Sequence, residues 1–319
     1  MTNHRTDERP RAPRTLVLLA FAAVYVLWGS TYLAMRLGVR TLPPFLLAST
    51  RFAVAGAVVV LWYRLTGGPR LTRDMWSGAA RTSALLLLGG NGGVVWAVQR
   101  IPSGVAAVVV SVLPLWIVLL EWVGGRRPSA RVLAGVALGL GGVVVLSRPE
   151  TLAASGQRTV DPIGVAVVAL ASLSWAIGTL YSRRTVIPGA PLLGAGLQML
   201  TGSGYLLVLG LLTGEPRRLA ASHVSGESIA ALIYLIIFGS LVAYSAYVWL
   251  LQVDTPARVA TYAYVNPVVA VFLGWMLADE PLTPRMLFAA LIIIVAVVLV
   301  TSSAAAASPA AAVSDTRRR

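Results

Sequence analysis

The sequence predicts an all-α polytopic membrane protein with ten transmembrane helices arranged as two inverted five-helix repeats. Three observations lead to this prediction. Hydrophobic residues make up 57% of the 319 residues and charged residues only 12%, about half the charged fraction of a soluble domain. Long apolar runs recur along the chain, separated by short links rich in Pro, Gly and Arg. Finally, the second half of the chain repeats features of the first.

Ten segments are long and apolar enough to cross the hydrocarbon core of a bilayer, which takes about 20 residues of helix. They lie at residues 15–36, 44–65, 78–98, 102–123, 130–147, 162–182, 191–212, 228–250, 256–277 and 284–302. The first follows an Arg-rich leader, residues 1–14. We expect this segment to be retained, because no convincing signal-peptide cleavage site follows it. Residues 303–319 form a low-complexity tail that is predicted to be disordered.

The arginines predict the orientation in the membrane, because cytoplasmic loops carry an excess of positive charge. If the N-terminus lies inside, the cytoplasmic segments hold seventeen arginines and the outer segments eight, and Arg51 lies within the second span. We therefore expect a multi-pass protein of the cell membrane with both termini in the cytoplasm. Residues 148–161 are then an external linker.

The two predicted repeats are residues 15–147 and 162–302. A shift of 147 residues aligns Trp28 with Trp175 and, further along, Pro44 with Pro191. Each repeat contains five spans. Because five is an odd number, the second repeat must enter the membrane from the opposite side. Inverted repeats of this kind are typical of transporters, whose binding site lies near the membrane midplane between the halves.

Pro114 and Pro267, which a shift of 153 residues brings into register, lie inside the fourth and ninth spans. A proline inside a helix removes a backbone donor and costs about 3 kcal/mol. Interrupted helices at corresponding positions of two halves indicate a transporter's binding site. We therefore predict that both spans are broken there and that Asn266 faces a central cavity. The alternative is an ordinary packing kink.

Specific motifs occur in four of the spans: WGS in the first, RF in the second, PSG followed by Pro in the fourth, and NP with a following acidic-Pro turn in the ninth. In this combination, the sequence resembles the EamA-type ten-helix exporters of the drug/metabolite transporter superfamily. The resemblance covers residues 15–302. It implies two inverted five-helix units and secondary transport, often outward, of amino acids or other small metabolites. It does not fix the substrate, because the superfamily also handles sugars, nucleotide sugars and drugs.

Arg51 lies about seven residues inside the second span, where an arginine costs roughly 2.5–3.5 kcal/mol on insertion scales. It should therefore face a partner or a wet cavity. One interpretation is an anion site, in which the planar guanidinium binds a substrate carboxylate. The other is a structural anchor that bonds to backbone carbonyls or extends towards the interface. The corresponding residue of the second repeat is Gln198, so the cavity is expected to be asymmetric.

Asn91, in the stretch GGNGG of the third span, has two open interpretations: a substrate contact or a tie between helices. Aromatic residues also lie within the spans, and apolar walls with a few polar groups suit a small amphipathic solute. The aromatic residues predicted to bind substrate are Trp28, Tyr32, Trp116, Trp175, Tyr244 and Tyr262. Taken singly, such residues also occur in the aromatic belt at the membrane interface.

Acidic and metal-binding residues are scarce inside the spans. No Asp, Glu or His lies at mid-membrane, so the usual buried proton relay is missing. Asp279 and Glu280 follow the ninth span and are interpreted as a helix-capping turn before Pro281. The chain has no Cys and only two His. No catalytic site, metal site or cofactor is therefore predicted, which argues against an enzyme.

The net charge of +14 does not indicate nucleic-acid binding, because the arginines flank the apolar runs and so mark topology. A receptor or scaffold would not need the paired prolines. We therefore expect a transporter that exports an amino acid or another small metabolite through a central cavity. A multidrug or lipid-type efflux carrier of the same superfamily is the alternative. The expected partners are a small-molecule substrate and the lipid bilayer; the sequence predicts no oligomeric state.

Cysteine labelling tests the predicted orientation, because the chain has no cysteine of its own. A cysteine at Ser155 should react with an impermeant thiol reagent in intact cells. A cysteine at Ser129 should react only after the membrane is permeabilised, since its loop is predicted to be cytoplasmic. The opposite labelling pattern would contradict the orientation.

Overall fold

The computed structural model describes residues 13–68, 70–125, 128–147, 161–182, 185, 190–254, 259, 262–280 and 282–306. Within these residues all regular structure is helical, which agrees with the predicted all-α class. The predicted leader lies outside the described residues up to residue 12, as do residues 148–160 of the linker and residues 307–319 of the tail.

Each predicted span falls on helix over most of its described residues. The first half contains α1 (Arg14–Ala22), η1 (Ala23–Leu27), α2 (Trp28–Gly38), α3 (Pro44–Leu65), α4 (Arg73–Ser83), η2 (Ala84–Gly92), α5 (Gly93–Ala97), α6 (Ser103–Val110), α7 (Leu113–Val123) and α8 (Ala130–Ser147). The second half contains α9 (Pro162–Ser182), α10 (Pro191–Leu212), α11 (Glu215–Ala221), α12 (Gly226–Tyr234), η5 (Leu235–Tyr244), α13 (Ser245–Val253), α15 (Tyr262–Ala278) and α16 (Pro284–Ala306). The η elements are π-helical and continue directly into the α-helices that flank them.

Six helical stretches among the described residues are long and apolar enough to cross a membrane. They are Arg14–Gly38, Pro44–Leu65, Ser103–Val123, Pro162–Ser182, Pro191–Leu212 and Gly226–Val253. Shorter apolar helices lie at Ala130–Gly139, Val265–Ala278 and Pro284–Ala296. These helices make the chain a polytopic membrane protein, while the count of ten crossings remains a prediction. Large apolar side chains such as Leu61, Leu207 and Phe272 are exposed on the helices, as expected for contact with lipid.

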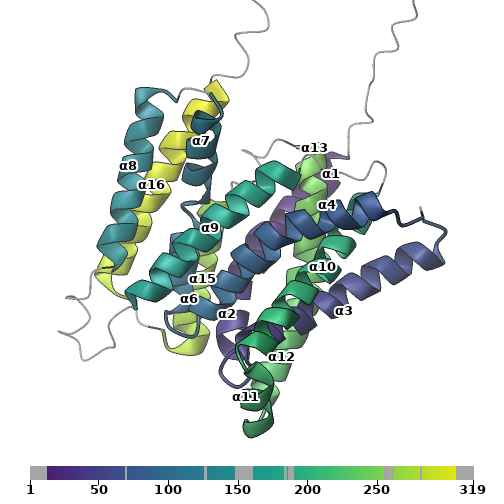
Figure 1. Cartoon of the computed structure of the whole chain (residues 1–319). Coiled ribbons are helices and arrows are strands. Elements are labelled where there is room, and N and C mark those ends of the chain that lie inside the picture. The colour runs from purple at the N-terminus through teal and green to yellow at the C-terminus, as the bar shows by residue number, and fades with distance from the viewer. Residues whose placement is uncertain are drawn as a thin grey trace, which may run out of the picture.

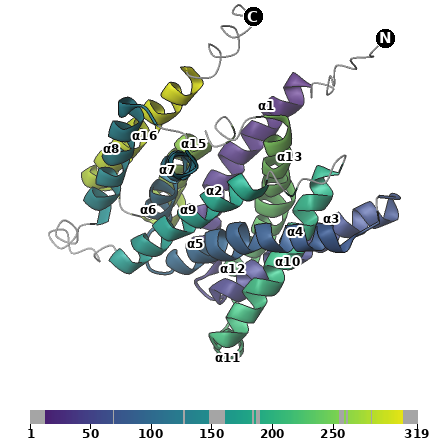
Figure 2. The ribbon, with the colours of Figure 1, turned by 45° about the horizontal axis from the view of Figure 1, so that its top comes forward.

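Helices of the two halves pack against one another in pairs. α3 packs on α10, α8 on α16, and α2 on α15; Figure 1 shows α8 and α16 side by side at the left, and α10 next to α3 at the right. α1 begins and α16 ends at one face of the molecule, which we call the proximal face. The opposite, distal face carries α11 (Figures 1 and 2). The buried core lies between the faces, where α2, η2, α6 and η5 meet.

The two predicted helix breaks have different outcomes. α6 ends at Val110 and α7 begins at Leu113, so Pro114 stands in the first turn of a new helix, where its missing N–H costs nothing. α15, in contrast, continues through Pro267, and the prediction of a break there is wrong. A helix can run through a proline when neighbouring groups bond the carbonyls that it leaves free.

The predicted disordered tail also begins too early, because α16 continues to Ala306 rather than ending at residue 302. Its last residues, "TSSAAA", end in alanine, which has the highest helix propensity. Once α16 is anchored by packing on α8, adding these residues to its end avoids the cost of a new helix nucleus.

The π-helical elements η2 and η5 lie at corresponding positions of the two halves. The shift of 153 residues moves η2 onto residues 237–245, which overlap η5 almost completely. π-helical turns are rare and are frequently found at functional sites. A matching pair of them supports the predicted repeat and directs attention to the third and eighth spans.

Close contact between α3 and α10 depends on small residues. A Cβ atom added at Gly56 would lie 2.9 Å from the carbonyl oxygen of Gly196 and 2.9 Å from the backbone nitrogen of Leu200. Backbone atoms cannot move aside as side chains do. The helices can therefore approach this closely only with glycine at the crossing.

The substitution Gly56→Ala should therefore destabilise the protein by about 1–3 kcal/mol, the usual cost of overpacking. Thermal inactivation of the purified protein in detergent measures this effect. Gly204→Ala is the matched control on α10, because a Cβ atom there meets nothing within 4 Å and alanine favours helix. Equal thermal stability of the two variants would contradict the proposed contact.

Candidate functional site

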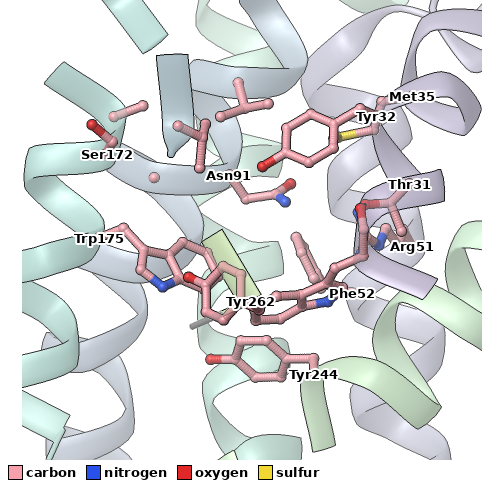
Figure 3. Close-up of a pocket in the computed structure, with 15 residues that line it drawn as sticks. Thr31, Tyr32, Met35, Arg51, Phe52, Asn91, Ser172, Trp175, Tyr244 and Tyr262 are labelled. Atoms are coloured by element: carbon pink, nitrogen blue, oxygen red, sulfur yellow. The ribbon is translucent and has the colours of Figure 1, made fainter. Parts of the chain in front are cut away.

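A cavity lies at the centre of the molecule, between the two halves. Its lining residues are Trp28, Thr31, Tyr32, Met35, Arg51, Phe52, Gly90, Asn91, Val94, Val110, Ala171, Ser172, Trp175, Tyr244 and Tyr262. They come from α2, α3, η2, α5, α6, α9, η5 and α15 (Figure 3). About 60 Å³ is available to the centres of water molecules, which is room for a handful of waters. The free space at this point is therefore small.

Seven of the nine residues predicted to bind substrate line this cavity. They are Trp28, Tyr32, Arg51, Asn91, Trp175, Tyr244 and Tyr262. Figure 3 labels all of them except Trp28 and shows how the labelled side chains converge from different helices. From the sequence, these residues are expected only to lie between the two predicted repeats, with no prediction of which of them are neighbours. The tertiary structure places them around one small volume.

Trp116 and Asn266 are not among the lining residues. Trp116 stands behind the wall, where its Nε1 donates to Oγ of Ser172 at 2.9 Å. Asn266 is only 2% exposed. When the side-chain amide is oriented with its nitrogen towards the carbonyl oxygens of Tyr25 and Tyr262, it donates to both, at 2.9 Å and 3.2 Å respectively. The amide is thus used to tie α15 to η1, because in a medium without water these carbonyls need a partner.

Arg51 is the charged group of the cavity wall and is 3% exposed. Its Nε donates to Oγ of Ser240 at 2.7 Å, and its guanidinium lies 4.8 Å from the ring centre of Phe52. In the described part of the chain, the two ion pairs are Arg40–Glu227 and Arg100–Asp161, so no described carboxylate neutralises Arg51. A buried charge without a counter-charge is costly.

The backbone of η5 makes room for this guanidinium. A Cβ atom at Gly239 would lie 2.7 Å from Nη2 of Arg51. The carbonyl oxygen of Gly239 also accepts a hydrogen bond from Nε1 of Trp28 at 3.2 Å. The residue that corresponds to Arg51 in the second half, Gln198, reaches η5 as well, since its Oε1 accepts from the hydroxyl of Tyr244 at 2.6 Å.

The aromatic walls form one connected group around Trp28. The ring of Trp28 lies 5.6 Å from Trp175, 4.9 Å from Tyr247 and 5.1 Å from Tyr262, measured between ring centres. The contacts with Trp175 and Tyr262 are edge-to-face, a favourable arrangement of aromatic rings. Nε1 of Trp175 donates to the hydroxyl of Tyr247 at 3.2 Å. The polar atoms of the two tryptophans are therefore already bonded to the protein.

Asn91 differs from these residues, because its Oδ1 is buried without a hydrogen-bond partner among the described residues. An unpaired buried acceptor costs about 1–3 kcal/mol and calls for an explanation such as water or a ligand. Since Asn91 lines the cavity, its oxygen is available to a donor group placed there.

Sequence analysis missed several residues of the site. Ser240, Gly239 and Tyr247 hold Arg51 and the tryptophans in place, and Thr31 and Phe52 line the cavity itself. The only available signal was proximity: Phe52 follows Arg51, and Thr31 lies one turn after Trp28. Ser240 lies in an ordinary apolar run that gives no indication of its role.

A second, wider hollow of about 580 Å³ lies against α3, η2, α5, α9 and α10. Its lining is almost entirely apolar and includes Gly89, Gly92, Gly93, Trp96 and Val208. A specific binding site combines apolar walls with a few placed polar groups; the central cavity has both, whereas the lining of this hollow is almost without polar groups. In the part of the chain that the structure describes, no group of three or more His, Cys, Asp or Glu could hold a metal ion.

The sequence model of the EamA-like transporter family matches residues 15–148 and 162–302. The uncharacterized inner membrane transporter YedA of Escherichia coli K12 is 37% identical over 83% of this chain and 83% of its own length. Protein PecM of Dickeya dadantii is 29% identical over 82% of this chain and 84% of its own. The uncharacterized transporter YvbV of Bacillus subtilis is 25% identical over 88% and 89%, respectively.

One solved structure, described only as the crystal structure of a protein, has the same fold with a TM-score of 0.63. It is 22% identical and covers 92% of this chain and 99% of its own. This likeness concerns the fold. The shared fold covers almost the whole chain.

Proposed function

The chain belongs to the EamA-like transporter family, and we propose that it is a secondary transporter that exports an amino acid or another small metabolite. In this proposal, the central cavity opens alternately to the two faces of the membrane. The two repeats that surround the cavity are inverted copies of one another, and the proximal face is cytoplasmic. Multi-pass membrane transport is the activity of the family; substrate, direction and mechanism are the proposal.

The observation that carries the proposed substrate class is the buried guanidinium of Arg51. It lines the cavity, is held through Nε by Ser240, and has no carboxylate partner among the described residues. Its Nη groups are the part of the fork that can bind a planar carboxylate. An anionic group of the solute would supply the missing counter-charge.

The free oxygen of Asn91 adds a second requirement. An acceptor that lacks a partner favours a solute that carries an N–H or O–H donor as well as an anionic group. The aromatic rings provide apolar walls for the rest of the molecule. A zwitterionic amino acid meets all three conditions. An organic cation does not, because the lining contains no acidic residue.

Alternating access is supported by the way both halves contribute to the cavity. Trp28 and Trp175, which correspond under the shift of 147 residues, contact each other edge-to-face. The matching elements η2 and η5 both line the cavity. In the present conformation its free volume is about 60 Å³, so a wider state is needed to admit a solute.

The alternative, a multidrug or lipid-type carrier, is favoured by one specific observation. The apolar hollow of about 580 Å³ against α3, α9 and α10 could take an acyl chain or a large apolar drug. The two proposals differ in which residues matter. The alternative requires the walls of this hollow and makes no use of Arg51 or Asn91.

Arg51→Lys and Arg51→Gln test the anion site. Arg51→Lys keeps the charge but loses the bidentate geometry, and Arg51→Gln loses both. Since a hydrogen bond to a charged group is worth about 1.5–3 kcal/mol, apparent affinity should fall at least roughly tenfold in Arg51→Gln and by a smaller factor in Arg51→Lys. The measurement is uptake of a panel of labelled amino acids by inside-out vesicles, normalised to the amount of transporter in the membrane.

Tyr205→Phe, in the wall of the apolar hollow, is the matched control and should transport normally. Normal affinity in Arg51→Gln would show that the site assignment is wrong. Loss of both Arg51 variants from the membrane would show that the arginine is needed for folding, as the structural-anchor interpretation holds.

Asn91→Leu tests the second requirement, because leucine has a similar shape but offers no acceptor. The wild-type protein should prefer an amino acid over the analogue that lacks its amino group. In Asn91→Leu, the ratio of the apparent affinities for the two compounds should fall roughly tenfold, since one hydrogen bond to a charged donor is removed. Competition by the two compounds for uptake measures it. An unchanged preference would assign Asn91 to helix packing alone.

A further inference from the structure

Two carboxylates on the distal face cross from the second half of the chain to helices of the first half. Glu215, the first residue of α11, is 1% exposed. Its Oε1 accepts from the backbone N–H of Phe45 at 3.1 Å, and its Oε2 accepts from that of Leu46 at 2.8 Å. Both N–H groups belong to the first turn of α3.

Glu280 makes the same pair of contacts at a different helix. It lies in the turn between α15 and α16, directly after Asp279, whose φ of 51° is left-handed. Its Oε1 accepts from the N–H of Ser103 at 2.8 Å, and its Oε2 from that of Gly104 at 3.2 Å. The turn was predicted to cap a helix, and the structure shows that Glu280 caps α6, about 177 residues earlier in the chain.

The helices that receive these carboxylates have no cap of their own. α3 and α6 are preceded by Pro43 and Pro102, which form no side-chain hydrogen bond to the helix. The first N–H groups of a helix lack intrahelical partners and carry its positive dipole end. A carboxylate that accepts two of them is therefore a strong, charge-assisted link. It joins two helices that belong to opposite halves.

Both carboxylates also sit directly over a glycine. A Cβ atom at Gly210 would lie 3.2 Å from Oε2 of Glu215, and one at Gly274 would lie 2.5 Å from Oε2 of Glu280. The same local arrangement thus occurs twice. A helix of the second half has a glycine near its C-terminal end, and the glutamate that follows this helix caps a first-half helix that is preceded by a proline.

We propose that Glu215 and Glu280 are the latches that hold the distal face closed, and that their release opens the central cavity to that face. The helices they hold form walls of the cavity, since α3 carries Arg51 and α6 ends at Val110. The inference rests on the proposed function in one respect, because it assumes that the cavity must open to the distal face at all.

The sequence does not repeat the two glutamates at the corresponding turns of the first half. Under the shift of 153 residues, Glu280 corresponds to Arg127, and the linker that corresponds to the Glu215 turn, "RLTGGPRLT" at residues 64–72, contains no acidic residue. An inverted repeat without further differences would close equally well at both faces. Because the first half does not repeat these glutamates, the latches bias the protein towards the state that is closed at the distal face and can open at the proximal face.

Other links also join the two halves, among them the hydrogen bond from Oγ of Ser228 to the carbonyl oxygen of Leu37 at 2.9 Å and the ion pair Arg100–Asp161. The ion pair Arg40–Glu227 joins the end of the first span to α12, with an N–O distance of 3.0 Å, but both side chains are about half exposed. Exposed ion pairs of this kind contribute little. Glu227 therefore serves as a matched control: it is a glutamate of the same face and the same half that pairs with a side chain rather than with a helix terminus.

The experiment measures access to the cavity from the distal face. A single cysteine replaces Val110 in the cavity wall, in a chain that otherwise has none. A separate variant with a cysteine at the exposed residue His223 identifies which side of the membrane the distal face occupies. The rate of reaction of Val110→Cys with an impermeant thiol reagent, added from that side, is then compared between backgrounds.

Glu215→Gln and Glu280→Gln should each raise this rate several-fold and together by more than tenfold, because glutamine has one acceptor and no charge. Glu227→Gln should leave it unchanged. Glu280→Asp, which keeps the charge but is one methylene too short to reach both N–H groups, should also raise the rate and serves if a glutamine variant does not accumulate. From the proximal side, the rate should fall or stay constant.

An unchanged rate from the distal side in the double variant, with the protein folded in the membrane, would overturn the proposal. If the double variant had a lower thermal stability but no faster labelling of the cavity cysteine, both glutamates would act only as helix caps and the proposal would be wrong. The labelling needs no substrate, so its result stands apart from the proposed function: failure of the transport assay with a normal gain in access would leave the latches in place and remove only the substrate assignment.

Discussion

In a bilayer, every polar group of the backbone must find its partner inside the protein, because no water is present to provide one. The irregular helices of this chain meet that requirement through side chains of other helices. Trp28 bonds to the carbonyl of Gly239 in η5, and Ser174 bonds to that of Leu85 in η2 at 2.8 Å. Asn266 bonds to that of Tyr25 in η1. The π-helical elements are thus each held by a donor from a different span.

This constraint also shapes the cavity. Donors and acceptors that satisfy the protein itself are not available to a solute, so the indole N–H groups of Trp28 and Trp175 are already used. Arg51 and Asn91 can still bind a solute, since among the described residues Arg51 has no carboxylate partner and Oδ1 of Asn91 has no hydrogen-bond partner. A cavity with many aromatic residues therefore has few groups that can select a solute, which makes the effect of each of them large.

The two halves share their architecture but not their polar groups. Arg51 and Gln198 occupy corresponding positions, and both reach η5, yet one is a cation and the other a neutral amide bonded to Tyr244. The distal face carries Glu215 and Glu280, whereas the corresponding linkers of the first half carry no acid. If the two halves are inverted repeats, as we propose, such differences would influence which conformation is favoured and which charge is accepted.

The amino-acid sequence by itself determined the all-α membrane class, the positions of the helical segments and the family, since hydropathy and the repeated motifs depend on local composition. It also identified seven of the fifteen residues that line the cavity, because Trp28, Arg51 and Trp175 are unusual for their depth in the spans. It could not decide that α15 runs through Pro267 or that Asn266 faces the backbone of Tyr25. Nor could it predict that Glu280 seats on α6. Those outcomes depend on which neighbour satisfies a given hydrogen-bonding group, and in a membrane protein that neighbour belongs to another helix, far away in the sequence.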